Sequence, residues 1–170
     1  QLEDNDLVIA TSKEELPLAI NRFLQSILFT NNMFMLASPN TSNIFLSDLS
    51  SFFEKNNIRA TPGVTFQGNS GLTHKFDFLI SGFKDIPTRL IKTLTISKND
   101  SMFAKAILTD VMQTRLIRES PTSFYVFIND FDRTGKKLTI DSDILTLFSQ
   151  NQIKPVKYSE RNQVVAELAK

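Results

Sequence analysis

The sequence predicts one α/β domain with a mixed central sheet of about five strands and helices on both faces. Two observations predict this fold class. Three apolar strand patterns follow one another across short turns, as in an antiparallel meander, and the later strand patterns alternate with helical ones. The 170 residues, of which 41% are hydrophobic and 22% charged, suit one globular domain with a sizeable core.

Composition excludes several classes of protein. The net charge of +1 is lower than expected for a protein that binds nucleic acid mainly through the phosphate backbone. Nucleic-acid binding would therefore need a local basic face. The absence of Cys excludes a disulfide framework, a thiolate metal site and a cysteine nucleophile, and fits a reducing, cytoplasmic setting. No apolar run reaches membrane-spanning length, so we expect no membrane partner.

The first residues are expected to lie outside the domain. Residues 1–11 are acidic where a signal peptide needs a basic start, and the chain begins with Gln1. We therefore expect residues 1–11 to be a linker or the tail of a missing upstream domain. Residues 12–170 are expected to form the single α/β domain.

Two helices are predicted before the strands. Ser12 and Glu15 have the spacing of a capping box, in which each side chain accepts from the free backbone N–H of the other. Apolar residues at helical spacing follow, and the Ser-Pro-Asn-Thr stretch at 38–41 is expected to end this helix. A second helix is predicted over Ile44–Lys55.

The meander comes next. Its strands are predicted at Gly63–Phe66, Leu72–Ile80 and Thr88–Thr95, with a glycine-rich turn at 68–71 between the first two. Apolar and polar residues alternate along the second strand. This alternation predicts that every second side chain points to the same face of the sheet.

Five further elements complete the prediction. A helix is expected from Asn99 or Asp100 to about Glu119, and a near-continuous apolar strand, typical of burial on both faces, over Ser123–Asp130. A short helix at Asp141–Gln152, a strand at Ile153–Tyr158 and a helix at Ser159–Lys170 follow.

Asp77 and Lys92 are the candidate catalytic residues, because both interrupt apolar strands of the meander. A carboxylate and a lysine on neighbouring strands could hold Mg²⁺ against a phosphodiester, with Asp77 as a metal ligand and Lys92 stabilising charge on the phosphate. The alternative is a buried ion pair between the two, with no chemistry. Both interpretations stay open.

A metal site would need more than one protein oxygen. Glu54, near the end of the second helix, and Asp110, on the inward stripe of the third, are the further candidate metal ligands. The alternative for Glu54 is a solvated helix face. The alternative for Asp110 is a partner for Arg115 or Lys92.

The other polar residues of the meander have separate expectations. His74, the only histidine, is expected on the face of Phe76 and Phe78, opposite Asp77, as a hydrogen-bonded core residue. Three basic residues around the meander are the candidate nucleic-acid contacts: Lys75, Arg89 and Lys92.

The segments FQGNSGLTHKFDFLI, RLIKTL, YVFIND and IKPVKYSER resemble a bacterial and phage family described as domain of unknown function 1829. The resemblance spans roughly residues 14–161. Members of this family usually follow a domain of unknown function 1828. The resemblance therefore implies an upstream domain of the same polypeptide as a partner.

The order of elements is also similar to the core of the PD-(D/E)XK nuclease superfamily. That resemblance implies a metal-binding Asp on the second strand, here Asp77, and a (Glu/Gln)-x-Lys tripeptide on the third, here Leu90-Ile91-Lys92. Leu90 stands where an acid or amide is expected. The implied function is Mg²⁺-dependent hydrolysis of DNA phosphodiesters. The alternative is a degenerate relative that serves as a non-catalytic nucleic-acid-binding or protein-interaction module.

Overall fold

The computed structural model describes residues 2–3, 6–7, 11–12, 15–68, 71–96, 100–132 and 134–170. The chain divides into two compact units, Gln1–Ile44 and Phe45–Lys170. The first unit contains two short antiparallel strands, β1 (Leu2–Glu3) and β2 (Asp6–Leu7), and the larger part of helix α1 (Leu16–Lys55). The predicted tail over residues 1–11 lies largely outside the described residues.

Helix α1 begins just after the predicted cap, where the Ser12 hydroxyl oxygen accepts from the Glu15 N–H at 3.4 Å. The predicted break at residues 38–41 is wrong, because α1 continues through it to Lys55. Pro39 lacks an N–H and costs a helix interior about 3 kcal/mol, yet the neighbouring turns keep their own bonds. The second unit takes up only the last turns of α1, from Phe45 onward.

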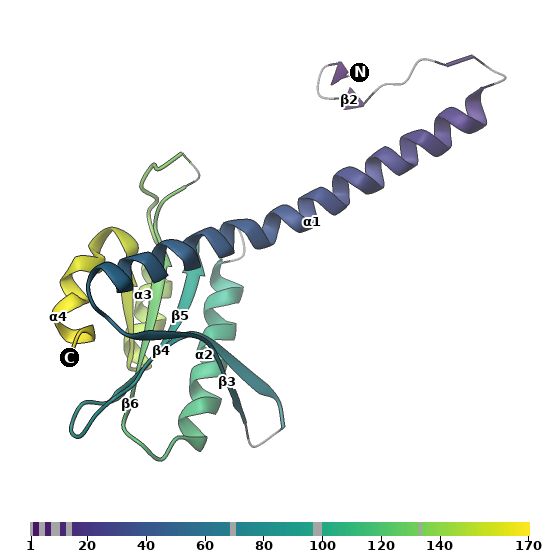
Figure 1. Ribbon diagram of the computed structural model, residues 1–170. Helices are drawn as coiled ribbons and strands as arrows, with labels where there is room; N and C mark the ends of the chain where they lie inside the picture. The colour runs from purple at the N-terminus through teal and green to yellow at the C-terminus, as the bar shows by residue number, and fades with distance from the viewer. Residues whose placement is uncertain are drawn as a thin grey trace. The chain divides into compact units, whose positions relative to one another are not determined.

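The second unit is built on a five-stranded mixed sheet, as predicted (Figure 1). The strands lie in the order β3-β4-β5-β6-β7, with antiparallel pairing from β3 to β5 and parallel pairing from β5 to β7. Their bounds are β3 Ala60–Gln67, β4 Thr73–Ile80, β5 Thr88–Thr95, β6 Thr122–Asn129 and β7 Ile153–Lys157.

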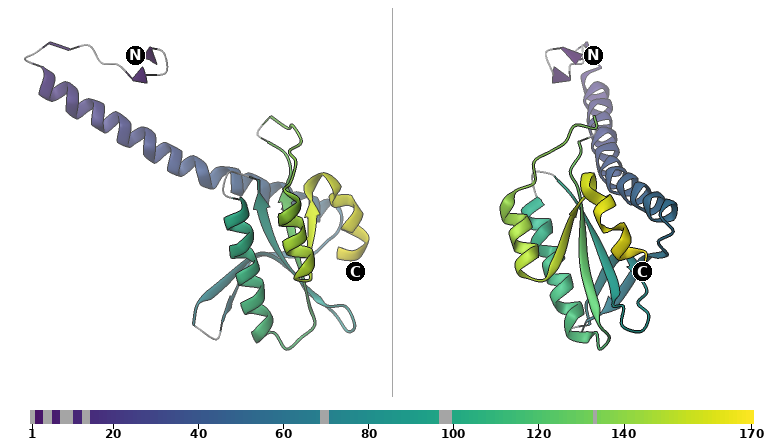
Figure 2. Two further views of the ribbon diagram at one scale, coloured as in Figure 1. Left: turned by 180° about the vertical axis from the view of Figure 1, so that it is seen from behind. Right: turned by 90° about the vertical axis from the view of Figure 1, so that its left-hand side faces the viewer.

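Helices cover both faces of this sheet (Figure 2). Helices α2 (Asp100–Ile117) and α3 (Ser142–Gln150) lie on one face, and α3 is capped by Asp141, which accepts from the Asp143 N–H at 2.9 Å. The opposite face carries the end of α1 and the C-terminal segment. That segment, predicted as one helix, is the 3₁₀ helix η1 (Tyr158–Val164) followed by α4 (Val165–Leu168).

Two apolar layers hold these elements to the sheet. The α1-side core includes Phe53, whose ring makes edge-on contacts with Phe78 and Phe127 at centroid distances of 5.2 and 5.8 Å. The α2-side core includes Phe76 and Leu90, together with buried residues of α2 and α3. Each sheet face therefore has its own core, and a side chain of the sheet contributes to one or the other.

Candidate functional site

Strand β4 changes face in the middle of the meander. Simple alternation predicts Phe76 and Phe78 on one face, but Phe76 packs in the α2-side core and Phe78 in the α1-side core. Asp77 and Phe78 line the same pocket, so two consecutive side chains point to one side. Opposite Asp77 on β3 lies Gly63, whose φ of 66° is readily adopted only without a Cβ. The expectation that His74, Phe76 and Phe78 share a face is wrong for Phe78.

Strands β4 and β5 also separate at this point. Their ladder pairs Ile80 with Arg89, Leu79 with Leu90 and Phe78 with Ile91, and the described residues form no pair beyond Phe78. Where the next backbone pair of the ladder would lie, the Thr93 N–H donates to Asp77 Oδ2 at 2.7 Å, and the Thr93 hydroxyl donates to the same oxygen at 2.9 Å. The Asp77 side chain thus replaces a backbone acceptor where the two strands diverge.

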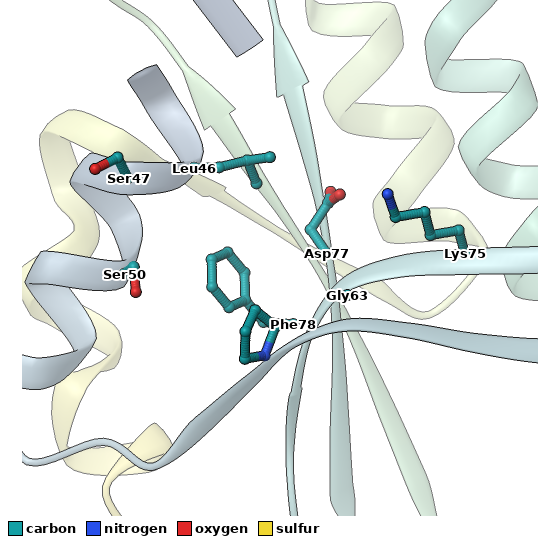
Figure 3. A pocket seen from close by; sticks show the side chains of 8 residues that line it. Leu46, Ser47, Ser50, Gly63, Lys75, Asp77 and Phe78 are labelled. Carbon is teal, nitrogen blue, oxygen red and sulfur yellow. The ribbon is translucent and has the colours of Figure 1, made fainter. Parts of the chain in front are cut away.

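A pocket of about 330 Å³ lies beside Asp77 on the α1 side (Figure 3). The lining residues are Leu46, Ser47, Ser50, Pro62, Gly63, Lys75, Asp77 and Phe78. Lys75 and Asp77 project to the same side of β4 in Figure 3. Asp77 supplies the single carboxylate among the described lining residues, and Thr93 already engages one of its oxygens. A Mg²⁺ ion there would depend on water and substrate oxygens for most of its ligands.

The Lys92 side chain lies on the α2 side and is paired with Asp110. Its ammonium group contacts Asp110 Oδ2, and it lies 5.5 Å from the centroid of the Phe76 ring. His74 Nδ1 lies 2.8 Å from Asp110 Oδ1. Because an ionised carboxylate only accepts, His74 donates through Nδ1. The ion pair of Asp110 with Lys92 was one of the predicted alternatives, and His74 is the expected hydrogen-bonded core histidine, 5% exposed.

The second ring nitrogen of His74 faces Gly68. A Cβ at Gly68 would stand 2.8 Å from His74 Nε2, so the chain approaches the ring closely because residue 68 has no side chain. Nε2 has no hydrogen-bond partner among the described residues. The cluster of His74, Lys92 and Asp110 therefore joins β4, β5 and α2 next to Gly68.

Asp77 and Lys92 consequently lie on opposite faces of the sheet. The ion pair between them, one of the two interpretations left open by the sequence, is absent among the described contacts, since each side chain has another partner. The shift of alternation in β4 is the physical cause. On β5, Ile91 packs in the α1-side core and Thr93 donates to Asp77, whereas Leu90 is 0% exposed in the α2-side core.

Glu54 lies apart from both groups. Its side chain is exposed, and it does not line the Asp77 pocket, which corresponds to the solvated helix face given as its alternative. Over the described residues, no group of three or more His, Asp or Glu side chains is placed to hold a metal ion. Asp77, Glu54 and Asp110, the three predicted metal ligands, therefore belong to three separate environments.

The three predicted nucleic-acid contacts also have different environments. Lys75 is exposed at the pocket, whereas Lys92 is held by Asp110. Arg89 is only 3% exposed, and its Nη2 donates to the Glu167 carbonyl oxygen at 2.8 Å. The expectation that Arg89 lies on an exposed basic face is wrong, because β5 directs it beneath the C-terminal helix.

A polar cluster around Arg89 was not foreseen from the sequence. The Tyr125 hydroxyl donates to the Glu167 carboxylate, which also pairs with Lys154. Burial and the hydrogen bond to Glu167 raise the pKa of Tyr125. Burial alone would raise the pKa of Glu167, but the hydrogen bonds from Lys154 and Tyr125 outweigh it and lower that pKa. The cluster ties α4 to β6 and β7.

Asp130 is a second residue that sequence reasoning missed. It is 0% exposed and accepts from the Ser159 N–H at 2.9 Å and from the Ser159 hydroxyl at 2.6 Å. The sequence held a signal, because Asp130 is the last residue of the predicted strand Ser123–Asp130, whose apolar run predicts burial on both faces. Its role is to fix the start of η1 against the end of β6.

Comparisons with known proteins give one match. The family model described as domain of unknown function DUF1829 matches residues 68–161, more than half of the chain. Neither the curated proteins nor the solved structures yield a match. Among the described residues, no helix has a stretch long and apolar enough to cross a membrane. The matched segment runs from Gly68 to Arg161 in η1, and the chain belongs to the family of domain of unknown function DUF1829.

Proposed function

We propose that this chain is a non-catalytic protein-interaction module built on a nuclease-like arrangement of helices and strands. The observation that carries the proposal is the position of Asp77 and Lys92 on opposite faces of the sheet, each with its own partner. Metal-dependent hydrolysis of a phosphodiester needs the metal ligand and the cation that stabilises the phosphate in one site.

The nuclease-like part of the proposal is supported by the order of elements. A helix, a three-strand meander, a helix, a strand, a helix and a strand follow one another from α1 to β7. This is the order expected for a PD-(D/E)XK core, with Asp77 on the second strand of the meander and Leu90 in place of the acid. The substitution of an apolar residue at that position fits a degenerate relative.

A catalytic role is the second candidate, and one observation favours it. Lys75 and Asp77 line the same pocket, so a lysine from β4 could take the place of Lys92. With one carboxylate in the described lining, such a site would bind Mg²⁺ weakly in the absence of substrate.

A protein partner fits the described surface better than a nucleic-acid backbone does. Of the three basic candidates, Arg89 is buried, Lys92 is neutralised by Asp110, and Lys75 stands beside the carboxylate of Asp77, which repels phosphate. Helix α2 exposes several large apolar side chains, which are more typical of protein contacts than of phosphate contacts. These residues are Met102, Phe103, Met112 and Leu116.

The catalytic and binding alternatives are separated by one set of assays on the full 170-residue chain. Plasmid DNA is incubated with the chain and Mg²⁺ or Mn²⁺, beside the variants Asp77→Asn and Glu54→Gln. We expect no cleavage above the buffer control. Metal-dependent cleavage that is lost in Asp77→Asn and kept in Glu54→Gln would overturn the proposal in favour of a nuclease.

Nucleic-acid binding is measured separately by the fluorescence anisotropy of a labelled DNA duplex at several salt concentrations. We expect only weak, non-specific association. Tight binding that falls steeply with salt and weakens at least about tenfold in Lys75→Ala would make the module a nucleic-acid-binding one instead.

A further inference from the structure

We propose that the outer edge of β3 binds an extended peptide of another protein, which pairs antiparallel with β3 and places one large apolar side chain in the pocket beside Asp77. This inference rests on the proposed function, because it names the surface and the partner of the interaction module. Among the described residues, β3 pairs only with β4 and forms one edge of the sheet. An edge strand presents unpaired backbone N–H and C=O groups to a strand that lies beside it.

The register of β3 and β4 shows which backbone groups of β3 point outward. The Gly68 N–H donates to the Leu72 carbonyl oxygen at 2.8 Å and so continues the register of the two strands. In an antiparallel pair, every second residue directs both its N–H and its C=O to the neighbouring strand. Counting back from Gly68, Thr65 and Gln67 direct theirs away from β4. Both residues are exposed, so an added strand can reach these groups.

This edge lacks the features that keep strands from pairing. β3 contains no charged residue, and Pro62 precedes the segment 63–67 that carries the outward groups. At the opposite edge of the sheet, β7 has five residues, with Pro155 in its middle and a lysine on either side. Charge, proline and short length all discourage an added strand. β3 is therefore the edge better suited to binding one.

The pocket lies on the side to which an added strand would direct side chains. Val64 and Phe66 pack against the α2-side core, so Thr65 between them lies on the α1 side. Its partner on β4, Lys75, lines the pocket. Residues opposite one another on neighbouring strands share a face, so a residue paired with Thr65 or Gly63 from outside also projects to the α1 side. A Cβ placed at Gly63 would meet no atom within 4 Å beyond its chain neighbours, so this side of β3 is open.

The lining of the pocket favours an apolar side chain from a different sequence. Leu46, Pro62 and Phe78 form its apolar wall (Figure 3). A second copy of β3 would not supply a matching side chain. Only residues with outward backbone groups can pair closely with Thr65, and in this part of β3 they are Thr65 and Gln67 themselves. Neither is large and apolar, so the occupant is a strand of another protein.

A proline at position 65 tests the edge. Thr65→Pro removes an outward N–H and spares the groups of Val64 and Phe66 that point to β4, whereas the matched control Thr65→Ala keeps the N–H. Random linear peptides displayed on phage are selected against the full chain, and the enriched peptides are synthesised with a fluorescent label. We expect these peptides to share one large apolar position and to bind Thr65→Pro at least about tenfold more weakly than Thr65→Ala.

Filling the pocket gives a second test with the same labelled peptides. Ser47→Phe places a ring in the lining, and Ser51→Phe makes the same change at an exposed position one turn later, outside the lining. We expect Ser47→Phe to weaken binding at least about tenfold and Ser51→Phe to leave it within about twofold. Urea unfolding followed by tyrosine fluorescence checks that each variant keeps the stability of the wild type.

The outcomes separate this inference from the proposed function. Peptides that bind Thr65→Pro and Thr65→Ala equally would occupy another surface, such as α2, and would overturn the inference while the interaction module stands. A selection that enriches no peptide also overturns it. A chain of twice the 19.3 kDa mass in light scattering that becomes monomeric in Thr65→Pro would make the occupant a second copy and equally overturn it. Metal-dependent DNA cleavage bears on the proposed function instead.

Discussion

Asp77 accepts two hydrogen bonds from Thr93, one from the backbone N–H at 2.7 Å and one from the hydroxyl at 2.9 Å. Both donors meet the same carboxylate oxygen at the point where β4 leaves β5. The carboxylate therefore closes the open edge of β5, which the backbone of β4 no longer reaches. This structural role exists whether or not Asp77 has a chemical one.

Replacing Asp77 by Ala is expected to lower the free energy of unfolding by about 2 kcal/mol, because the Thr93 N–H loses its acceptor and a charged hydrogen bond. Thr93→Val, which removes only the hydroxyl donor, should cost about 1 kcal/mol. Urea unfolding of both variants measures the difference. Equal stabilities of Asp77→Ala and the wild type would show that water accepts the hydrogen bond of the Thr93 N–H as well as Asp77 does.

Asp110 is expected to matter more for stability than either of its partners. Asp110→Ala removes the carboxylate that pairs with Lys92 and accepts from His74. The side chains of Lys92 and His74 are only 14% and 6% exposed, so water replaces the carboxylate poorly. The expected loss is about 3 kcal/mol, since removing one partner leaves an uncompensated buried charge. Lys92→Met keeps the aliphatic contact with Phe76 and should cost about 1 kcal/mol.

A double-mutant cycle checks this assignment. If Lys92 and Asp110 stabilise one another, Asp110→Ala should cost less in the Lys92→Met background than in the wild type. Strictly additive losses would contradict a coupling between the two side chains.

Leu90→Glu is expected to unfold the sheet rather than restore a metal site. Leu90 is 0% exposed in the α2-side core, on the face opposite Asp77, so a carboxylate there is buried without a partner. We expect a loss of more than about 3 kcal/mol, against less than about 1.5 kcal/mol for the volume-conserving Leu90→Met. Thermal unfolding measures the stability of both variants, and titration calorimetry measures whether Leu90→Glu binds Mg²⁺. A stable Leu90→Glu that binds Mg²⁺ would refute the assigned geometry.

The Glu167 cluster predicts a dependence of stability on acid pH. The folded-state pKa of Glu167 lies below its ordinary value of 4.5, so its contribution is present above that value and is lost as pH falls through the lower folded pKa. Glu167→Gln lacks this titration. We therefore expect the variant to be less stable than the wild type at neutral pH, with the difference shrinking between about pH 5 and about pH 3.

The size of this effect should be modest. Lys154 and Glu167 are 48% and 43% exposed, so water and salt screen their pair. Added salt at neutral pH should reduce the difference between the wild type and Glu167→Gln, which urea unfolding in low and high salt measures. A difference that does not change with pH would mean that Glu167 acts through packing alone.

Much of the architecture could be predicted because it depends on local patterns. The bounds of β5 were predicted to the residue and those of β6 to within one, since runs of apolar and β-branched residues define strands locally. The break in α1 was not predicted correctly. A proline signal is local and costs a helix about 3 kcal/mol, whereas the backbone hydrogen bonds of a 40-residue helix extend through many turns on either side of residue 39.

The sequence by itself determined the fold class, the strand order of the meander and the polar residues that interrupt it. Only the tertiary structure decided which of them meet. Alternation along a strand assumes an unbroken pleat, whereas the side chains of β4 change face between Phe76 and Phe78 beside Gly63. The partners Thr93 and Asp110 come from 16 and 18 positions along the chain from Asp77 and Lys92. A one-residue shift moves a side chain to the other face of a sheet, and it therefore separates Asp77 from Lys92.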